Sequence, residues 1–149
     1  MSLQLEIVTP KGSVISTSVE EVMLPGSNGE FGVLDGHIPL LAALRPGVVR
    51  FKSQGKEVRL AVSVGFAEVG ANERVLVLTD NHAFPDQIEL EAVYTELRDA
   101  EAALKEWAGG VEELDAEKAE WKEVPGHREL RIRADWAQAR IDVKKSAAH

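Results

Sequence analysis

One stretch of the sequence, residues 24–47, constrains the fold more than any other because tight turns divide it. It reads LPGSNGEFGVLDGHIPLLAALRPG and contains five glycines and three prolines. Glycine permits positive φ, whereas proline fixes φ and removes a hydrogen-bond donor, so this composition predicts a succession of turns. Two apolar pieces, Phe31–Leu34 and Ile38–Leu44, lie between the turns and need a folded body to pack against. We interpret the stretch as a rigid surface that is presented to a partner.

The glycine spacing of this stretch argues against nucleotide phosphate binding. A dinucleotide fingerprint needs Gly-x-Gly-x-x-Gly between a strand and a helix, and a phosphate-binding loop ends in Gly-Lys-Ser/Thr. Here the first four glycines are separated by three, three and four positions, and no Gly-Lys-Ser/Thr follows. Neither phosphate-binding motif is therefore present.

Composition narrows the class of protein further. The 149 residues suffice for one domain with an appendage, and the four histidines are scattered, without a second histidine at metal-ligand spacing. No cysteine is present, which excludes disulfides and thiolate chemistry. The net charge of −8 argues against nucleic acid and against direct binding to anionic lipid. With no signal-like or membrane-spanning run, we expect a soluble cytoplasmic protein with no metal and no cofactor.

The first 85 residues predict an antiparallel β-sandwich. Short segments with alternating or β-branched apolar residues are separated by turns every eight to twelve residues, as in sandwiches and barrels. Gln54-Gly55 is typical of a hairpin turn between two of them. We predict Phe51, Val62, Val64 and Phe66 to be core residues. The expected strands are residues 3–8, 14–18, 19–24, 47–53, 56–62, 64–69 and 74–79.

The remainder, residues 86–149, predicts two helices. Pro85 ends the last strand and Asp86 can cap a helix that begins near Gln87. An apolar seam then recurs at alternating spacings of three and four, and Gly109-Gly110 predicts a break in it. The seam resumes at Val111, Leu114 and Trp121, and Pro125-Gly126 ends the segment. The seam comprises Leu90, Val93, Leu97, Ala100, Leu104 and Trp107.

The last helix is expected from about Arg128 to Lys145, with an apolar stripe and a basic face. The stripe is Leu130, Ala134, Ala137 and Ile141, and the basic face carries Arg131, Arg133, Arg140, Lys144 and Lys145. Residues 86–123 sum to −9 and residues 124–149 to +3, so the two helices favour an antiparallel hairpin. Because small side chains bury little area, the hairpin is either a switch that opens or a permanently docked appendage.

Several motifs carry a resemblance that covers nearly the whole chain. They are Gly29-Glu30-Phe31-Gly32, Gly36-His37-Ile38-Pro39-Leu40-Leu41, Arg45-Pro46-Gly47, Val64-Gly65-Phe66-Ala67-Glu68-Val69 and Ala137-Gln138-Ala139-Arg140-Ile141. Together they resemble the epsilon subunit of bacterial F-type ATP synthase. The resemblance implies an α+β fold, with an N-terminal antiparallel β-sandwich (1–85) followed by a C-terminal antiparallel two-helix hairpin (86–149).

The resemblance also implies a non-catalytic rotor subunit that couples proton flow to ATP synthesis. In such a subunit the sandwich binds the gamma subunit and the ring of c subunits, here through Glu30, Phe31, His37, Ile38, Leu40 and Leu41. The hairpin can extend into the alpha/beta catalytic head and inhibit ATP hydrolysis. Arg131, Arg133, Arg140, Lys144 and Lys145 would then face an acidic stretch of the beta subunit. The subunit would lie at the cytoplasmic face of the inner membrane, associated with it only through the complex.

A second hypothesis is an ATP sensor whose hairpin closes on nucleotide. Some members of the resembled family bind ATP through Ile-Asp-x-x-Arg-Ala at the start of the first helix. Ile88 and Glu89 occupy the first two positions here, but Ala92 replaces the arginine that would face phosphate. This departure argues against ATP binding. A third hypothesis, a hydrolase or other enzyme, lacks a recognisable nucleophile–base–acid group.

Overall fold

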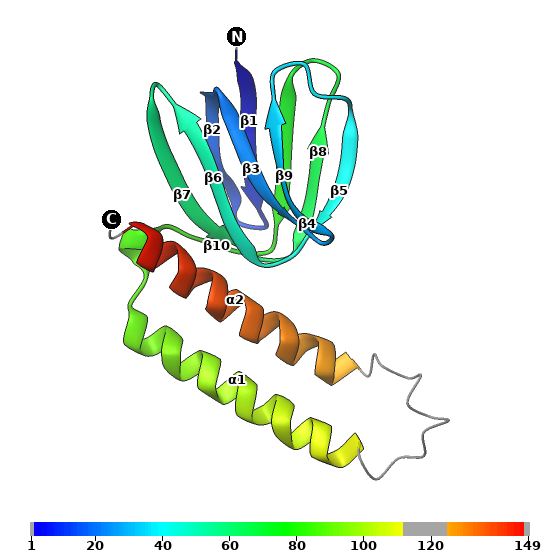
Figure 1. Cartoon of the computed structure of the whole chain (residues 1–149), viewed down its shortest axis with the longest axis vertical. Coiled ribbons are helices and arrows are strands. Elements are labelled where there is room, and N and C mark those ends of the chain that lie inside the picture. Colours follow the sequence, from blue (N-terminus) through cyan, green and yellow to red (C-terminus); the bar gives the residue numbers. More distant parts are fainter. Residues whose placement is uncertain (1, 112–124, 148–149) are drawn as a thin grey trace.

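The computed structural model describes residues 2–111 and 125–147. Ten strands form one sheet that rolls up into a sandwich, and two long helices lie across its lower end (Figure 1). This arrangement confirms the predicted fold class. The strands are β1 (Leu3–Thr9), β2 (Gly12–Val19), β3 (Glu21–Gly26), β4 (Gly29–Leu34), β5 (Leu40–Leu44), β6 (Gly47–Ser53), β7 (Lys56–Val62), β8 (Gly65–Val69), β9 (Arg74–Thr79) and β10 (His82–Ala83).

The strand order is β10-β7-β6-β3-β5-β8-β9-β1-β2, with β4 paired to β3. All pairings are antiparallel except that of β1 with β9, which is parallel and sets Leu5 beside Val75. The predicted hairpin at Gln54-Gly55 is confirmed, since both residues have positive φ, as a tight two-residue turn between twisted strands requires. The predicted bounds of β6, β7 and β9 are those of the structure.

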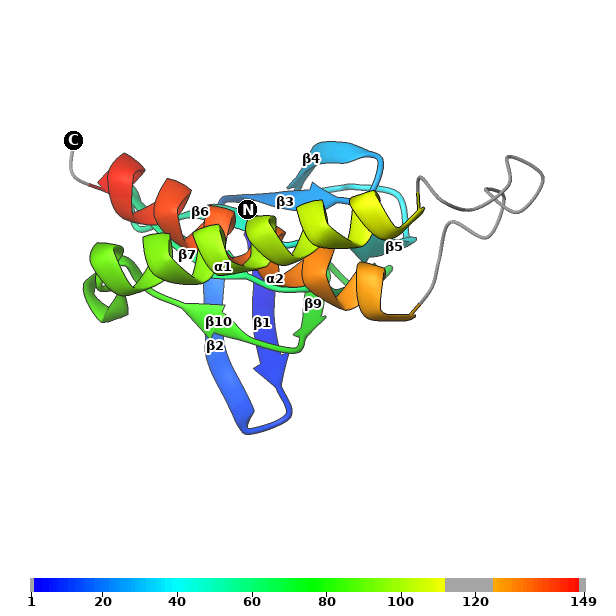
Figure 2. The same cartoon turned by 90° about the horizontal axis from the view of Figure 1, so that it is seen from below.

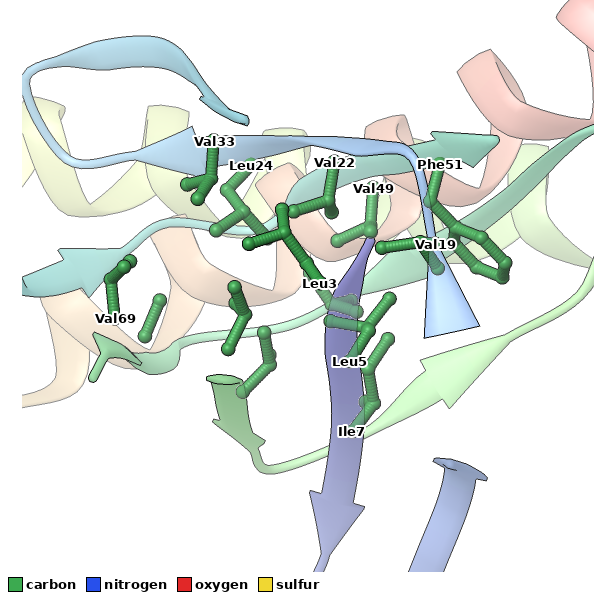
Figure 3. Close-up of a cluster of buried hydrophobic side chains, with 14 of the residues drawn as sticks. Leu3, Leu5, Ile7, Val19, Val22, Leu24, Val33, Val49, Phe51 and Val69 are labelled. Carbon is green, nitrogen blue, oxygen red and sulfur yellow. The ribbon is translucent and has the colours of Figure 1, made fainter. Parts of the chain in front are cut away.

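The sandwich encloses a core of aliphatic side chains that alternate along the strands. Leu3, Leu5 and Ile7 of β1 point inward while Gln4 and Glu6 are exposed. Figure 3 shows these side chains converging with those of β3 and β6. Burial of this many apolar groups is the main stabilising term of the domain. The core comprises Leu3, Leu5, Ile7, Val19, Val22, Leu24, Val33, Leu44, Val49, Phe51, Leu60, Val62, Ala67, Val69, Val75 and Val77.

One predicted core residue is on the surface. Phe51 and Val62 are buried, and Val64 is half-buried, but the side chain of Phe66 is 55% exposed, so that prediction was wrong. Along β8, Ala67 and Val69 face the core, and the period of two places Phe66 with Glu68 on the outer face. An alternation count over this strand would have found it.

The predicted helix start near Gln87, with Asp86 as its cap, was also wrong. A short 3₁₀ turn, η1 (Pro85–Gln87), comes first, and the side chain of Gln87 accepts a hydrogen bond from the Phe84 amide at 3.0 Å. Ile88 follows in extended conformation and is buried beneath the helices. Because its side chain must reach that cluster, α1 (Leu90–Val111) begins two residues later.

Helix α1 does not break at Gly109-Gly110 but runs through both glycines to Val111, which corrects the prediction. Both glycines lie within the last three residues of the described helix, where tertiary packing nearby favours the helical conformation over the local preference of glycine. Trp107 supplies such packing against His127 of the second helix, with ring centroids 5.3 Å apart. The predicted continuation of the seam at Leu114 and Trp121 lies outside the described residues.

Helix α2 (Pro125–Ala147) starts three residues earlier than predicted. Pro125 is its first residue, a position where the missing amide proton and the fixed φ of proline suit a helix. The helix lies antiparallel to α1, between α1 and the sandwich (Figures 1 and 2). The predicted stripe faces inward, with Ala134, Ala137 and Ile141 buried.

Sequence reasoning missed a further set of buried positions on α2. Ala139 and Val143 pack with Ala61 of β7, Ala83 of β10 and Ile88. This cluster joins the hairpin to the sandwich, whereas the prediction treated the helix as buried on one stripe alone. Helix and sandwich are therefore in contact through small side chains.

Candidate functional site

The glycine-rich stretch forms β3, β4, β5 and the turns between them. Gly36 adopts a φ of +84°, which a side chain would disfavour, and the His37 amide donates to the Leu34 carbonyl at 3.1 Å. The ring Nδ1 of His37 lies 2.6 Å from the carbonyl oxygen of Ile38. One backbone hydrogen bond and one contact of the His37 ring therefore constrain the loop 35–39, as is expected of a presented surface.

Exposed apolar side chains gather at this loop. Ile38 is 79% exposed and Leu41 is 69% exposed, and Leu34 and Leu40 are exposed too. The β4–β5 loop lies at the end of the sandwich that is remote from the helices (Figure 1). Exposed aliphatic residues in a cluster are typical of a protein–protein contact.

The structure does not bring all six predicted interface residues together. His37, Ile38, Leu40 and Leu41 share the loop and the start of β5, whereas Glu30 is at the opposite end of β4. There the Glu30 carboxylate accepts a hydrogen bond from the Arg50 guanidinium at 2.7 Å. Phe31 packs half-buried against the sandwich core. The predicted set therefore falls into two groups separated by the length of a strand.

A further apolar surface lies on the outer face of β5, β8 and β9. Phe66 is opposite Ala43 on one side and opposite Leu78, 48% exposed, on the other. Both Phe66 and Leu78 also line an open cleft of about 680 Å³ between the sandwich and the first turns of α2. Sequence reasoning missed this surface because it assigned Phe66 to the core.

The five residues predicted for the basic face of α2 also divide into two groups. Arg131 and Arg133, in its first half, are exposed. The Arg140 guanidinium bonds to the Glu96 carboxylate of α1, and the Lys144 Nζ donates to the Pro85 carbonyl oxygen at 2.9 Å. Only the first group is fully available to a partner.

Lys145 is a second basic residue that α1 engages. Its Nζ lies 5.6 Å from the ring centroid of Tyr94. A hydrogen bond with the Tyr94 hydroxyl raises the pKa of Lys145 above its ordinary value.

The start of α1 borders a small cavity of about 330 Å³ between the two helices and β10. Glu89, Ala92, Glu96, Trp136 and Arg140 line it, and Ile88 is buried beside it. Arg140 is the one arginine in this lining, and Glu96 already neutralises it. Two carboxylates and a paired cation are a poor environment for a polyphosphate.

Within residues 2–111 and 125–147, no group of three or more histidine, aspartate and glutamate side chains could hold a metal ion. None of the described helices is long and apolar enough to cross a membrane. The chemistry visible in the described part is that of contact surfaces.

Comparison with known proteins shows to which family this chain belongs. The family model for the ATP synthase Delta/Epsilon chain beta-sandwich domain matches residues 2–84. The ATP synthase epsilon chain of Magnetococcus marinus is 40% identical over 141 residues, which cover 95% of this chain and 93% of the relative. This chain belongs to the ATP synthase epsilon chain family.

A second relative agrees with this membership, and two solved structures share the fold. The epsilon chain of Desulforapulum autotrophicum is 45% identical over 116 residues, covering 77% of this chain and 85% of the relative. A chain of the Euglena gracilis mitochondrial ATP synthase shares the fold, with a TM-score of 0.71 at 20% identity, covering 99% of this chain and 82% of that one. A chain of the Tetrahymena thermophila mitochondrial enzyme has a TM-score of 0.63 at 12% identity, covering 97% of both chains.

Membership has a direct consequence for the role of this chain. An epsilon chain is a non-catalytic subunit of the ATP synthase, a membrane-bound complex. Its interactions with other subunits, rather than a reaction centre, are the functional features to locate. The candidate surfaces are the apolar loop of the sandwich, the apolar outer face of β5, β8 and β9, and the basic face of α2.

Proposed function

We propose that this chain is a rotor subunit in the central stalk of a proton-translocating F-type ATP synthase. Residues 1–85 bind the gamma subunit and the c ring and so help couple proton flow to ATP synthesis. Residues 86–149 regulate ATP hydrolysis by extending into the alpha/beta head. The subunit has no active site of its own and lies at the cytoplasmic face of the bacterial inner membrane, held there by the complex.

The observation that carries the first part of the proposal is the exposed apolar loop. Ile38, Leu40 and Leu41 lie at the end of the sandwich remote from the hairpin, on a backbone that internal hydrogen bonds fix. A rotor contact must transmit torque, so a rigid loop with exposed aliphatic groups suits it better than a mobile one. The two similar solved structures are ATP synthase assemblies that include a c ring, which agrees with a ring contact at one end.

Replacing both Leu40 and Leu41 by aspartate tests this part. We expect binding to purified gamma subunit to weaken at least tenfold, because two charges would be buried in an apolar contact. Ser16→Asp, a change at an exposed position on β2, is the matched control and should leave binding unchanged. Unaltered binding of the double variant would contradict the assignment of this surface.

The regulatory part is supported by the division of the chain into two bodies. The sandwich has its own core, and the hairpin adds a second cluster built largely of alanine and β-branched residues. A version that ends after Asp86 retains all ten strands. We expect it to bind gamma and to raise ATP hydrolysis by a reconstituted catalytic head, compared with the full chain. If hydrolysis is the same with both versions, the hairpin is not a brake.

The alternative, an ATP sensor, is less well supported. The cavity at Ile88 and Glu89 has a suitable position between the helices, but Ala92 supplies no cation and Glu96 neutralises Arg140. Calorimetry with millimolar ATP and magnesium tests it directly. Heat of binding that is absent from an Arg140→Ala variant would revive the sensor hypothesis.

A further inference from the structure

Arg140 is enclosed by side chains from both helices. Its guanidinium bonds to the Glu96 carboxylate of α1 and lies 5.0 Å from the ring centroid of Trp136, one turn earlier on α2. The Arg140 side chain is 14% exposed, whereas that of Glu96 is 55% exposed. A planar guanidinium that stacks on an aromatic ring and pairs with a carboxylate is held in a defined orientation.

Two further cations bind the same end of α2 to its neighbours. Lys144 reaches the Pro85 carbonyl in η1, the turn that connects sandwich and hairpin. Lys145 lies over Tyr94 on α1. The three contacts therefore link the second half of α2 to α1 and to the connecting turn.

The buried apolar area between the helices is small near Arg140. Ala137 and Ala139 are buried but present single methyl groups, so Ile141, Val143 and the partly buried Trp136 supply most of the apolar area of α2. Charged contacts at the rim thus contribute a larger share of the stability here than in the sandwich, where no charged residue of the described chain is buried.

We propose that Arg140, Lys144 and Lys145 form a clasp that closes the hairpin from within, without a bound ligand. Its consequence for regulation rests on the proposed function. While it is paired with Glu96 the Arg140 side chain is only 14% exposed, so it can reach an acidic partner only after the clasp opens. Arg131 and Arg133 remain available in the closed form and can make the first contact with an acidic surface.

Glu96→Gln isolates the clasp from the inhibitory contact, because it leaves every cation of α2 in place. Amide hydrogen exchange of the full chain reports how often the hairpin opens, even when the open form is rare. We expect protection of the Ala137 and Ile141 amides to fall about threefold, the effect of losing a partly exposed ion pair. Glu101→Gln, an exposed carboxylate on the same helix, is the matched control and should change nothing.

Salt and a second variant check the electrostatic origin of the effect. High salt should lower protection of these amides in the unaltered chain and have a smaller effect in Glu96→Gln, since the pair it screens is gone. Trp136→Leu should also lower protection by removing the stacking surface. Protection that is equal in Glu96→Gln and in the unaltered chain would overturn the clasp.

Hydrolysis by the reconstituted head then separates the clasp from the proposed function. Stronger inhibition by Glu96→Gln, together with reduced protection, supports both. Reduced protection with unchanged hydrolysis supports the clasp but contradicts the role of the hairpin as a brake. Protection that stays unchanged overturns the clasp whatever the hydrolysis result.

Discussion

The sandwich and the hairpin are stabilised in different ways. The sandwich closes around sixteen buried apolar residues, and its core contains no charged group. The hairpin rests on a cluster of eight buried residues, three of them on the sandwich side or the connecting segment, and cations lie along its edge. A body with a large core opens only by unfolding, whereas one with a thin seam and rim contacts can separate while each helix remains intact.

This difference in stability suits each part of the molecule to one of the two proposed tasks. A part that transmits torque benefits from a stiff core, and the apolar loop is attached to that part. A part that regulates needs two conformations of similar free energy, and small side chains with exchangeable charge contacts keep the difference small. Substitutions in the sandwich core, the helix contact, the apolar loop and a surface carboxylate pair test this difference between the two parts.

Leu5→Ala truncates a side chain at the centre of the sandwich core. Leu5 is fully buried on β1, between β2 and β9, so the truncation removes apolar contacts and leaves a cavity. We expect the free energy of unfolding to fall by about 3 kcal/mol, measured by urea denaturation. A loss of stability below about 1 kcal/mol would mean that the sandwich core tolerates a cavity and is less rigid than its role in transmitting torque requires.

Ile141→Ala truncates a side chain of the apolar stripe of α2. Ile141 is buried where α2 packs on α1 and the sandwich, and its truncation should favour hairpin opening by about 2 kcal/mol. Amide protection should fall in α2 and stay constant at Leu5 and Leu60 of the sandwich. Equal losses of amide protection in α2 and in the sandwich would show that the two parts unfold as one unit.

Gly36→Ala tests the rigid loop. Because Gly36 has a φ of +84°, alanine there should cost about 1 kcal/mol of stability and reduce gamma binding by shifting Ile38. Gly70 offers a control, since its φ is not positive and an added Cβ would meet its nearest neighbour at 3.7 Å, an ordinary contact distance. The two alanine variants are compared by thermal unfolding and by gamma binding, and equal effects would exclude a special role for the loop conformation.

Glu73→Gln is expected to have the smallest effect. A hydrogen bond with Asp35 and the charge of that residue raise the pKa of Glu73 above 4.5. The folded state therefore favours the protonated form, and this stabilisation, complete below pH 4.5, is lost as the pH rises through the folded pKa. At pH 7 the glutamine should raise the melting temperature slightly, and the gain should vanish in acid. Glu68→Gln serves as the control, and a gain that persists in acid would exclude the Asp35 interaction as its cause.

The sequence predicted those parts of the fold whose signals are local. Alternation in 47–53 and 56–62, with Gln54-Gly55 between them, yields the correct strands because the turn and the period of two agree. The helix break failed because glycine propensity is local, while Trp107 packs on His127 across the hairpin. The late start of α1 likewise depends on where Ile88 must be buried.

The candidate surfaces were only partly predictable. Exposure of Ile38 and Leu41 follows from a loop that cannot turn every apolar side chain inward, and the basic character of α2 is visible in the composition. The partner of Arg140 was not predictable, because Glu96 is 44 residues away and the pairing depends on the register of the two helices. The separation of Glu30 from His37 depends on the length and direction of β4.

The parallel pairing of β1 with β9 has a consequence for the order in which the chain can fold. Of the two strands that pair with β1, β2 follows it directly in the chain, but β9 ends only at Thr79. Until that strand emerges, one edge of β1 stays open to other chains, and its closure across this sequence separation is slow compared with a hairpin. Both helices follow β9 in the chain, so the strand that closes this edge is made before either helix.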